Sequence, residues 1–481
     1  MRQVISLLLL ICATRAFTQE GVPLFTKDFT PEEFAQRRNK VYDAIGANAL
    51  AVLQGAPSPA GYVRFRQSNE FYYLCGIETP HAYLLLDGKT RHAALYLPHR
   101  NERRESSEGK VLSAEDASLI TQWSGIEAVY GSEFLGEHLA RSARTPDKTS
   151  VYTCFAPAEG FAMSRDLALR AVADFAADPW DGRPAREGHF VDLLRTRFPH
   201  FELKNLTPAL DQLRLIKSPA EIAVIRKATR LSCFALMEGM RSTKPGMFEY
   251  ELDGMAKFIY YRNGAQGEAY YSLIASASNA WYPHYNAGKR QMQDGDFLLM
   301  DFAPDVGYYM SDVTRMWPVN GKFNQWQREL YDFYLACYQA ILQAIRPGVT
   351  AAQIKQEAVQ VMEGTLAQSK FSKPHYHAAA KSFVDSYREG AQNSETYLGH
   401  WVGMATHDVG IDTGPLRTGM VFTIEPALRV PEEKIYIRLE DLIVITETGK
   451  EIISDFVPWD RAGIEKLMAE KGLLETYPAG Q

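Results

Sequence analysis

The feature that most constrains this fold is a succession of elements that occurs twice after residue 217. Each copy starts with a long helical pattern that ends in a basic residue followed by Pro-Gly, at 244–246 and again at 346–348. A second helical pattern follows, and then strand-like segments that carry two acidic residues. The spacing of about a hundred residues is much longer than in solenoid repeats. The pattern predicts two similar halves facing each other across a pseudo-twofold axis, although Pro-Gly is also common between unrelated helices.

The first helix of this repeat has a clear start signal. Ser218 can cap the helix, Pro219 suits its first position and Glu221 completes a capping box. Apolar residues at helical spacing continue from there to about residue 242. The same reasoning predicts helices over residues 248–262, 325–345 and 351–367.

Each copy of the repeat ends in a segment that we interpret as a β-hairpin with two acids. The pattern centres the first turn at residues 306–307 and the second at 432–433, which would place the two acids of each hairpin directly opposite each other. Side chains so placed lie about 5 Å apart at Cβ, and like charges there are destabilising. The expected pairs are Asp301 with Asp312 and Glu425 with Glu440.

These four carboxylates stand among apolar residues, where a buried charge is costly unless it is paired or bound to a metal. Residues 400–410, between the hairpins, add two histidines, His400 and His407. Carboxylates and imidazole together suit first-row divalent ions, with manganese, cobalt and zinc all reasonable. Two such ions about 3.5–4 Å apart activate water for hydrolysis of an amide or ester. The alternative is that the acids form ordinary ion pairs with Arg315 and Arg438.

The N-terminal part of the chain has a different pattern, in which helix-like and strand-like stretches alternate to about residue 202. Such alternation predicts an α/β layer. A charge-dense stretch at 102–108 is interpreted as a solvated loop. With 481 residues the chain is too long for one ordinary core, and we place a domain boundary within residues 205–217. The clearest predicted elements are a helix over 31–45 and strands over 49–53, 82–87 and 93–97.

The first residues have the pattern of a secretory signal. Arg2 supplies a positive charge, residues 4–13 form an apolar run and Ala16 suits the last position before cleavage. The run is about half the roughly 20 residues that a membrane-spanning helix needs. We therefore expect an exported protein, periplasmic or secreted, without a stable membrane anchor.

Charge and cysteine content exclude some classes of partner and site. A formal net charge of −6 gives no basic footprint, so we expect no nucleic-acid partner. The four cysteines that follow residue 16 lack the spacing of a zinc site, and the sequence leaves open whether a disulfide forms.

The four acids and His400, in this order and local context, resemble the metal ligands of the pita-bread metallopeptidases. This family includes methionine aminopeptidase, aminopeptidase P and prolidase. Segments 318–323, 407–410 and 438–441 match the aminopeptidase P and prolidase branch, and residues 65–73 and 214–219 are similar to aminopeptidase P. The ligands implied by this resemblance are Asp301, Asp312, His400, Glu425 and Glu440.

Beyond the expected signal peptide over residues 1–16, the resemblance implies a mixed α/β (α+β) architecture with two domains. Residues 17–207 are expected to form an N-terminal domain like those of aminopeptidase P and creatinase. Residues 208–481 form a pita-bread catalytic domain with a pseudo-twofold internal repeat. The family also implies a homo-oligomer, either a dimer or a tetramer.

The resemblance further assigns roles to the metal ligands. Asp312 and Glu440 would bridge two divalent ions, manganese being expected and cobalt or zinc the alternatives. Asp301 would bind one ion, and His400 and Glu425 the other. Glu425 would also hold the attacking water and pass on its proton.

Three other residues would act beside the ligands. His407 and His284 would hydrogen-bond the substrate and the intermediate, and Arg438 would be a partner of the carboxylates. Without the resemblance, His284 is better explained as a packed core histidine. His375 and His377 match no motif and are assigned to a loop.

The sequence departs from the family in ways that concern the substrate pocket and not the metal site. Ala427 follows Glu425-Pro426 where a glycine is common, and Thr396 stands where aminopeptidase P often has a histidine. Residues 105–112 lack a Trp-x-Gly-Arg pattern.

We therefore expect an exported aminopeptidase for peptides with proline at the second position. The first alternative is a prolidase, restricted to Xaa-Pro dipeptides. An alternative of another class is a metal-free relative, either a creatinase-like hydrolase or a non-catalytic binding module. The aromatic run at residues 71–73 is expected either to offer a flat apolar surface to the proline ring or to pack inside its own domain.

Overall fold

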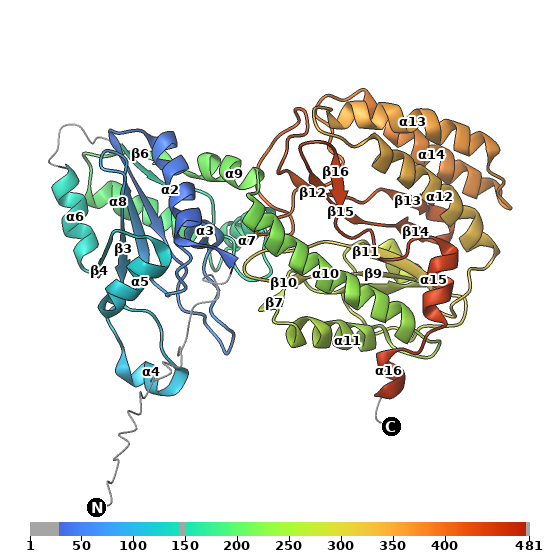
Figure 1. Cartoon of the computed structure of the whole chain (residues 1–481), viewed down its shortest axis with the longest axis horizontal. Coiled ribbons are helices and arrows are strands. Elements are labelled where there is room, and N and C mark those ends of the chain that lie inside the picture. Colours follow the sequence, from blue (N-terminus) through green and yellow to red (C-terminus); the bar gives the residue numbers. More distant parts are fainter. Residues whose placement is uncertain (1–27, 144–149, 478–481) are drawn as a thin grey trace, which may run out of the picture.

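The computed structural model describes residues 28–143 and 150–477, and the expected signal peptide lies outside them. Figure 1 shows two lobes that meet near α9 (Thr207–Leu215) and the start of α10 (Pro219–Ser242). Within the described ranges, no helix is long and apolar enough to cross a membrane. Their four cysteines, Cys75, Cys154, Cys233 and Cys337, are all free thiols.

The N-terminal lobe is built on one mixed sheet with the strand order β4-β3-β2-β1-β5-β6. Neighbouring strands are antiparallel from β1 to β3 and parallel at the remaining pairs. This arrangement confirms the predicted α/β layer. The strands are β1 (Ala49–Gln54), β2 (Tyr83–Asp87), β3 (His92–Leu97), β4 (Ala128–Gly131), β5 (Ser150–Thr153) and β6 (Glu202–Asn205). The helices are α2 (Pro31–Ile45), α3 (Asn69–Cys75), α4 (Glu102–Glu108), α5 (Ala117–Ser124), α6 (Phe134–Ala143), α7 (Arg165–Ala177) and α8 (Arg186–Arg197).

Residues 102–108 form a helix, α4, so the prediction of a loop there is wrong, although the segment is solvated as expected because none of its residues is buried. The Asn101 side chain caps the helix by accepting from Arg104 N. Arg104 and Glu108 pair one turn apart at 2.7 Å. Capping and charge pairing of this kind stabilise a helix without any core contact.

The C-terminal lobe has the predicted two halves. In the first, α10 and α11 (Glu249–Arg262) accompany a three-stranded antiparallel sheet of order β11-β9-β8. In the second, α12, α13 and α14 accompany a sheet of order β12-β15-β16. Figure 1 shows the strands of both halves between the two groups of helices. The bounds are β8 (Leu273–Ser276), β9 (Phe297–Asp301), β11 (Thr314–Pro318), α12 (Gln325–Ala344), α13 (Ala351–Gln368), α14 (Pro374–Ala391), β12 (Val421–Ile424), β15 (Asp441–Ile445) and β16 (Lys450–Ile452).

Smaller elements complete this lobe: β7 (Gly267–Glu268), β10 (Pro304–Asp305), β13 (Ala427–Val430), β14 (Ile435–Arg438), α15 (Arg461–Met468) and α16 (Leu473–Thr476). The helix start at Ser218 is confirmed, because its side chain accepts from Glu221 N while Glu221 accepts from Ser218 N. Helix α14 was not foreseen, and the assignment of His375 and His377 to a loop is wrong because both lie on it.

The predicted register holds in the second hairpin and fails in the first. Ile424 pairs with Asp441 and Ala427 with Arg438, so the same register places Glu425 opposite Glu440 as expected. In the first hairpin Asp301 pairs with Thr314 instead of Asp312. The cause is a turn one residue later than expected, at Gly307 and Tyr308, both with positive φ (58° and 71°).

Candidate metal centre and active site

One cavity of about 170 Å³ brings together every candidate site residue from both halves of the C-terminal lobe. They are the metal-ligand candidates and their three expected neighbours: His284, Asp301, Asp312, His400, His407, Glu425, Arg438 and Glu440. Most stand where a strand begins or ends, because strand ends of the two hairpins meet at this point.

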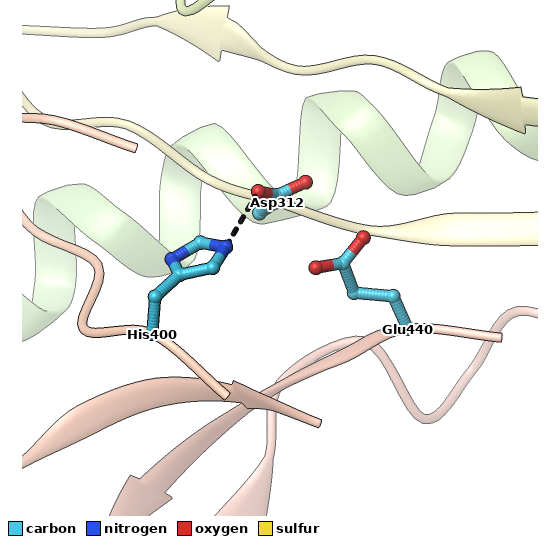
Figure 2. A group of neighbouring side chains, drawn as sticks. All are labelled: Asp312, His400 and Glu440. Atoms are coloured by element: carbon cyan, nitrogen blue, oxygen red, sulfur yellow. Dashed lines mark ion pairs between the residues drawn. The ribbon is translucent and has the colours of Figure 1, made fainter. Parts of the chain in front are cut away.

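At the centre of the site, Asp312, His400 and Glu440 direct their side chains toward one another (Figure 2). One ligand atom from each lies within 4.8 Å of the others, so the three could hold a single ion. His400 Nε2 is 3.4 Å from Asp312 Oδ2 and 3.3 Å from Glu425 Oε1. The donor set of three carboxylates and one imidazole is that expected for a first-row divalent ion.

Burial makes this arrangement costly without a cation. It raises the pKa of Asp312 and of Glu440 well above their ordinary values, and the neighbouring carboxylates raise both further. Arg315 does not relieve the charge, because its Nη2 pairs with Asp441 Oδ1 at 2.6 Å. Among the described residues, no lysine or arginine forms an ion pair with Asp312 or Glu440. The alternative of ordinary ion pairs therefore fails for these two acids, and the residues fit a bound divalent ion.

Asp301 is held in place by two other side chains. Tyr270 Oη lies 2.5 Å from Asp301 Oδ1 and 2.7 Å from Asp312 Oδ1, so its single proton is placed between the two carboxyl groups. Arg438 contacts Asp301 through Nη2 and Glu425 through Nη1, the latter at 3.3 Å. Burial and the two aspartates raise the pKa of Tyr270, so its phenol keeps the proton that it donates. Sequence reasoning missed Tyr270, whose one signal is its position just before β8.

His400 is placed by a close approach of two backbones. Its N–H donates to Thr423 Oγ1 at 3.2 Å, and Thr423 N donates to His400 O at 2.9 Å. The preceding residue is Gly399, where an added Cβ would lie 2.1 Å from Thr423 O. Only glycine permits this approach, which carries His400 to the acidic residues.

The other two histidines line the cavity from different sides. The ring of His407 lies 4.1 Å from that of His400, and partial burial and the His400 ring lower the pKa of His407. His284 is exposed, so it is not a packed core histidine. Its loop is organised by the buried Glu249 carboxylate, which accepts from the side chains of Ser276, Asn279 and Tyr285 and from Arg290 N.

The N-terminal lobe forms one side of the cavity, but not with the aromatic run. Tyr72 and Tyr73 are buried on α3, and Tyr72 stacks on Tyr308 with ring centroids 3.5 Å apart. Of the two alternatives for this aromatic run, contact of Tyr72 and Tyr73 with the substrate is therefore wrong. Helix α7 and the residues before it take that place, through Ala162, Met163, Ser164, Asp166, Leu167 and Arg170.

Comparisons with known proteins show the family of this chain. Residues 223–447 match the metallopeptidase family M24, and residues 34–152 match the aminopeptidase P N-terminal domain. The Xaa-Pro aminopeptidase of Escherichia coli is 30% identical over 465 residues, which cover 92% of this chain and 98% of that protein.

Solved structures show the same similarity. A putative aminopeptidase P from Bacillus anthracis has a TM-score of 0.77 and 25% identity, over 92% of this chain and 100% of that one. Aminopeptidase P from E. coli with the inhibitor Pro-Leu has a TM-score of 0.72 and 29% identity, over 92% and 98%. The predicted creatinase-like domain followed by a pita-bread domain is thereby confirmed. The chain belongs to the aminopeptidase P group of the M24 metallopeptidases.

Proposed function

We propose that this protein is an exported Xaa-Pro aminopeptidase that uses two divalent ions, manganese being the expected metal. The observation that carries the proposal is the convergence of the five candidate ligands in one cavity of a chain that matches an Xaa-Pro aminopeptidase over nearly its full length. Asp312 and Glu440 would bridge the ions, with Asp301 on one and His400 and Glu425 on the other.

Bound divalent ions supply Lewis acidity and lower the pKa of water. The residues of the chain do the remaining work. Glu425 is a quarter exposed, so its carboxylate can reach a water molecule, take its proton and pass that proton to the leaving nitrogen. Arg438 keeps the Glu425 and Asp301 carboxylates in place. His407 and His284 line the same cavity and would donate hydrogen bonds to the substrate carbonyl as negative charge develops there.

The proposed active site is compatible with hydrolysis of the imide bond that precedes proline. The nitrogen of proline carries no hydrogen and its φ is fixed, so a peptidase for Xaa-Pro bonds cannot rely on a backbone N–H at that position. Contacts to the carbonyl and to the free N-terminus must then position the substrate.

Hydrolysis of a matched set of peptides tests this function. Manganese-loaded protein should release the first residue from Ala-Pro-Ala and from Ala-Pro, and should leave Ala-Ala-Ala nearly intact. Cleavage confined to Ala-Pro would assign a prolidase instead. Absence of cleavage in all three, with metal bound, would favour a non-catalytic binding module.

Export, domain boundaries and assembly belong to the same proposal. The signal pattern supports removal of residues 1–16 and a periplasmic or secreted location. The two separate family matches, to residues 34–152 and 223–447, support domains over 17–207 and 208–481. N-terminal sequencing of protein from its native host should begin at residue 17. Light scattering of the purified protein should give the mass of a dimer or a tetramer, and a monomer would contradict that part.

A further inference from the structure

Asp408, the residue after His407, lies in the junction between the lobes and not in the cavity. Its side chain is 1% exposed. Asp408 Oδ1 is 2.5 Å from Arg214 Nη2, and Asp408 Oδ2 is 3.0 Å from Lys217 Nζ. Two successive residues thus have different surroundings. His407 lines the active-site cavity, while Asp408 is held by Arg214 and Lys217.

The N-terminal lobe holds one of these two cations, Arg214. Arg214 Nη2 is 2.7 Å from Glu159 Oε2, and Arg214 Nη1 is 3.4 Å from Glu70 Oε1. Glu159 is fully buried, so it has no water with which to exchange this contact. Arg214 therefore joins carboxylates of both lobes, and it is held in one position by them.

A second contact fixes the middle of the loop formed by residues 400–408. Asn69 Nδ2 donates to Met404 O at 3.1 Å and to Glu159 Oε2 at 2.5 Å. Asp408 N donates to Trp401 O at 2.8 Å, which closes the loop on itself. The loop formed by residues 400–408 is thus attached to the N-terminal lobe near its middle and at its end.

Gly403 packs directly against the ion pair of Asp408 and Lys217. An added Cβ at Gly403 would lie 2.1 Å from Asp408 Oδ2 and 2.8 Å from Lys217 Cε. The loop can fold this tightly only because residue 403 has no side chain.

We infer that Asp408 is a positioning residue, which sets the place of His407 in the cavity through its ion pairs with Arg214 and Lys217. This inference rests on the proposed role of His407. It means that the N-terminal lobe contributes to catalysis through a buried ionic network and not only by lining the substrate pocket. Displacement of a catalytic group by about 1 Å can cost about a hundredfold in rate.

The test compares Asp408→Asn with Asp305→Asn. Asp305 forms another buried ion pair between the lobes, with Arg66 at 2.8 Å, but does not touch the 400–408 loop. Both variants should lose thermal stability. Only Asp408→Asn should lower kcat, by about tenfold or more, with its metal content and KM little changed. If Asp408→Asn fails to fold, Lys217→Met takes its place with the same expected outcomes.

A double-mutant cycle completes the test. In a His407→Ala background, Asp408→Asn should lower kcat no further, because the residue that it positions is already gone. An equal loss of kcat in both backgrounds, or equal kcat in the Asp408 and Asp305 variants, would overturn the inference. Failure of the wild-type protein to cleave any Xaa-Pro peptide would overturn the proposed function instead.

Discussion

Thr314 and Glu440 pair with each other across the two halves of the catalytic lobe. Thr314 N donates to Glu440 O at 3.3 Å, Glu440 N donates to Thr314 O at 3.1 Å, and Thr314 Oγ1 donates to Glu440 Oε2 at 2.6 Å. Thr314 stands opposite Asp301 in one hairpin, and Glu440 opposite Glu425 in the other. This single bridge therefore joins both acidic hairpins, and the candidate ligands meet between the halves rather than within either one.

Removal of a proposed bridging carboxylate should abolish metal binding. Asp312→Ala should lose both ions, whereas Asp301→Asn should weaken mainly one. Elemental analysis after manganese loading is the measurement. Less than about one divalent ion per wild-type chain would contradict the two-ion proposal.

Substitution of the two neighbouring histidines should have different effects. His400→Ala should reduce metal content and activity together, because its Nε2 faces Asp312 and Glu425. His407→Ala should retain the metal and lower turnover by about a hundredfold, as expected for loss of one group that stabilises developing charge. Equal loss of metal in both variants would show that His407 is a ligand.

The stability of the metal-free protein should depend on pH through Asp312 and Glu440. Burial raises the pKa of both in the fold. The contribution of such a carboxyl to folding stability is fully present below its pKa in the unfolded chain, which is about 4. The contribution is lost as the pH rises through the higher pKa of the folded state. The double variant Asp312→Asn, Glu440→Gln should therefore gain Tm relative to wild type as the pH rises above about 4.

Added manganese should reverse the loss of stability that metal-free wild-type protein shows as the pH rises. Its stabilising effect should grow with pH, because the carboxylates and imidazole must lose their protons to bind it. Thermal unfolding with and without manganese across the pH range measures both effects. A Tm difference between the double variant and metal-free wild type that is constant with pH would contradict the assigned shifts.

Helix α7 should affect substrate binding through one face only. Leu167 lines the cavity, whereas Leu169 is on the same helix, is also exposed and does not line it. Leu167→Ala should raise KM for Ala-Pro-Ala several-fold, since it removes apolar surface worth about 1–2 kcal/mol from the pocket. Leu169→Ala is the matched control, and equal KM values for the two variants would remove α7 from the pocket.

The carboxylate of Glu249 should be required for the His284 loop. Glu249→Ala leaves several buried donors, including those of Ser276, without an acceptor, which should destabilise the protein by about 1–3 kcal/mol. It should also raise KM or lower kcat while metal content stays at the wild-type value. Glu251→Gln on the same helix is the control, because a glutamine side chain can also accept the hydrogen bond from Phe248 N. Wild-type kinetics in Glu249→Ala would show that the loop needs no such support.

Local patterns predicted much of this structure because they depend on short-range physics. The start of α10 at Pro219 follows from its cap and capping box, and the register of Glu425 opposite Glu440 follows from the alternation of the second hairpin. The four acidic ligand candidates were found because acids inside apolar strands conflict with burial unless a cation is near. The roles of His284, His407 and Arg438 came from the family resemblance instead.

The predictions that were wrong concern features that depend on contacts between residues distant in the sequence. Tyr308 adopts a positive φ, which few tyrosines do, and its position is fixed by stacking on Tyr72 and by a hydrogen bond to Glu78 Oε1 at 2.7 Å. The conformation of Tyr308 moves the turn of the first hairpin one residue later than the sequence predicts. The stack of Tyr72 on Tyr308 also explains why Tyr72 cannot contact the substrate. The local sequence around either tyrosine does not predict this stack.

The hydrogen bond between Asn69 and Met404 joins residues 335 positions apart in the chain. During synthesis on the ribosome, the N-terminal lobe emerges long before the loop that it will hold. Contacts of such high sequence separation form late and slowly. A growing chain therefore cannot order residues 400–408 against its N-terminal lobe until those residues have left the ribosome.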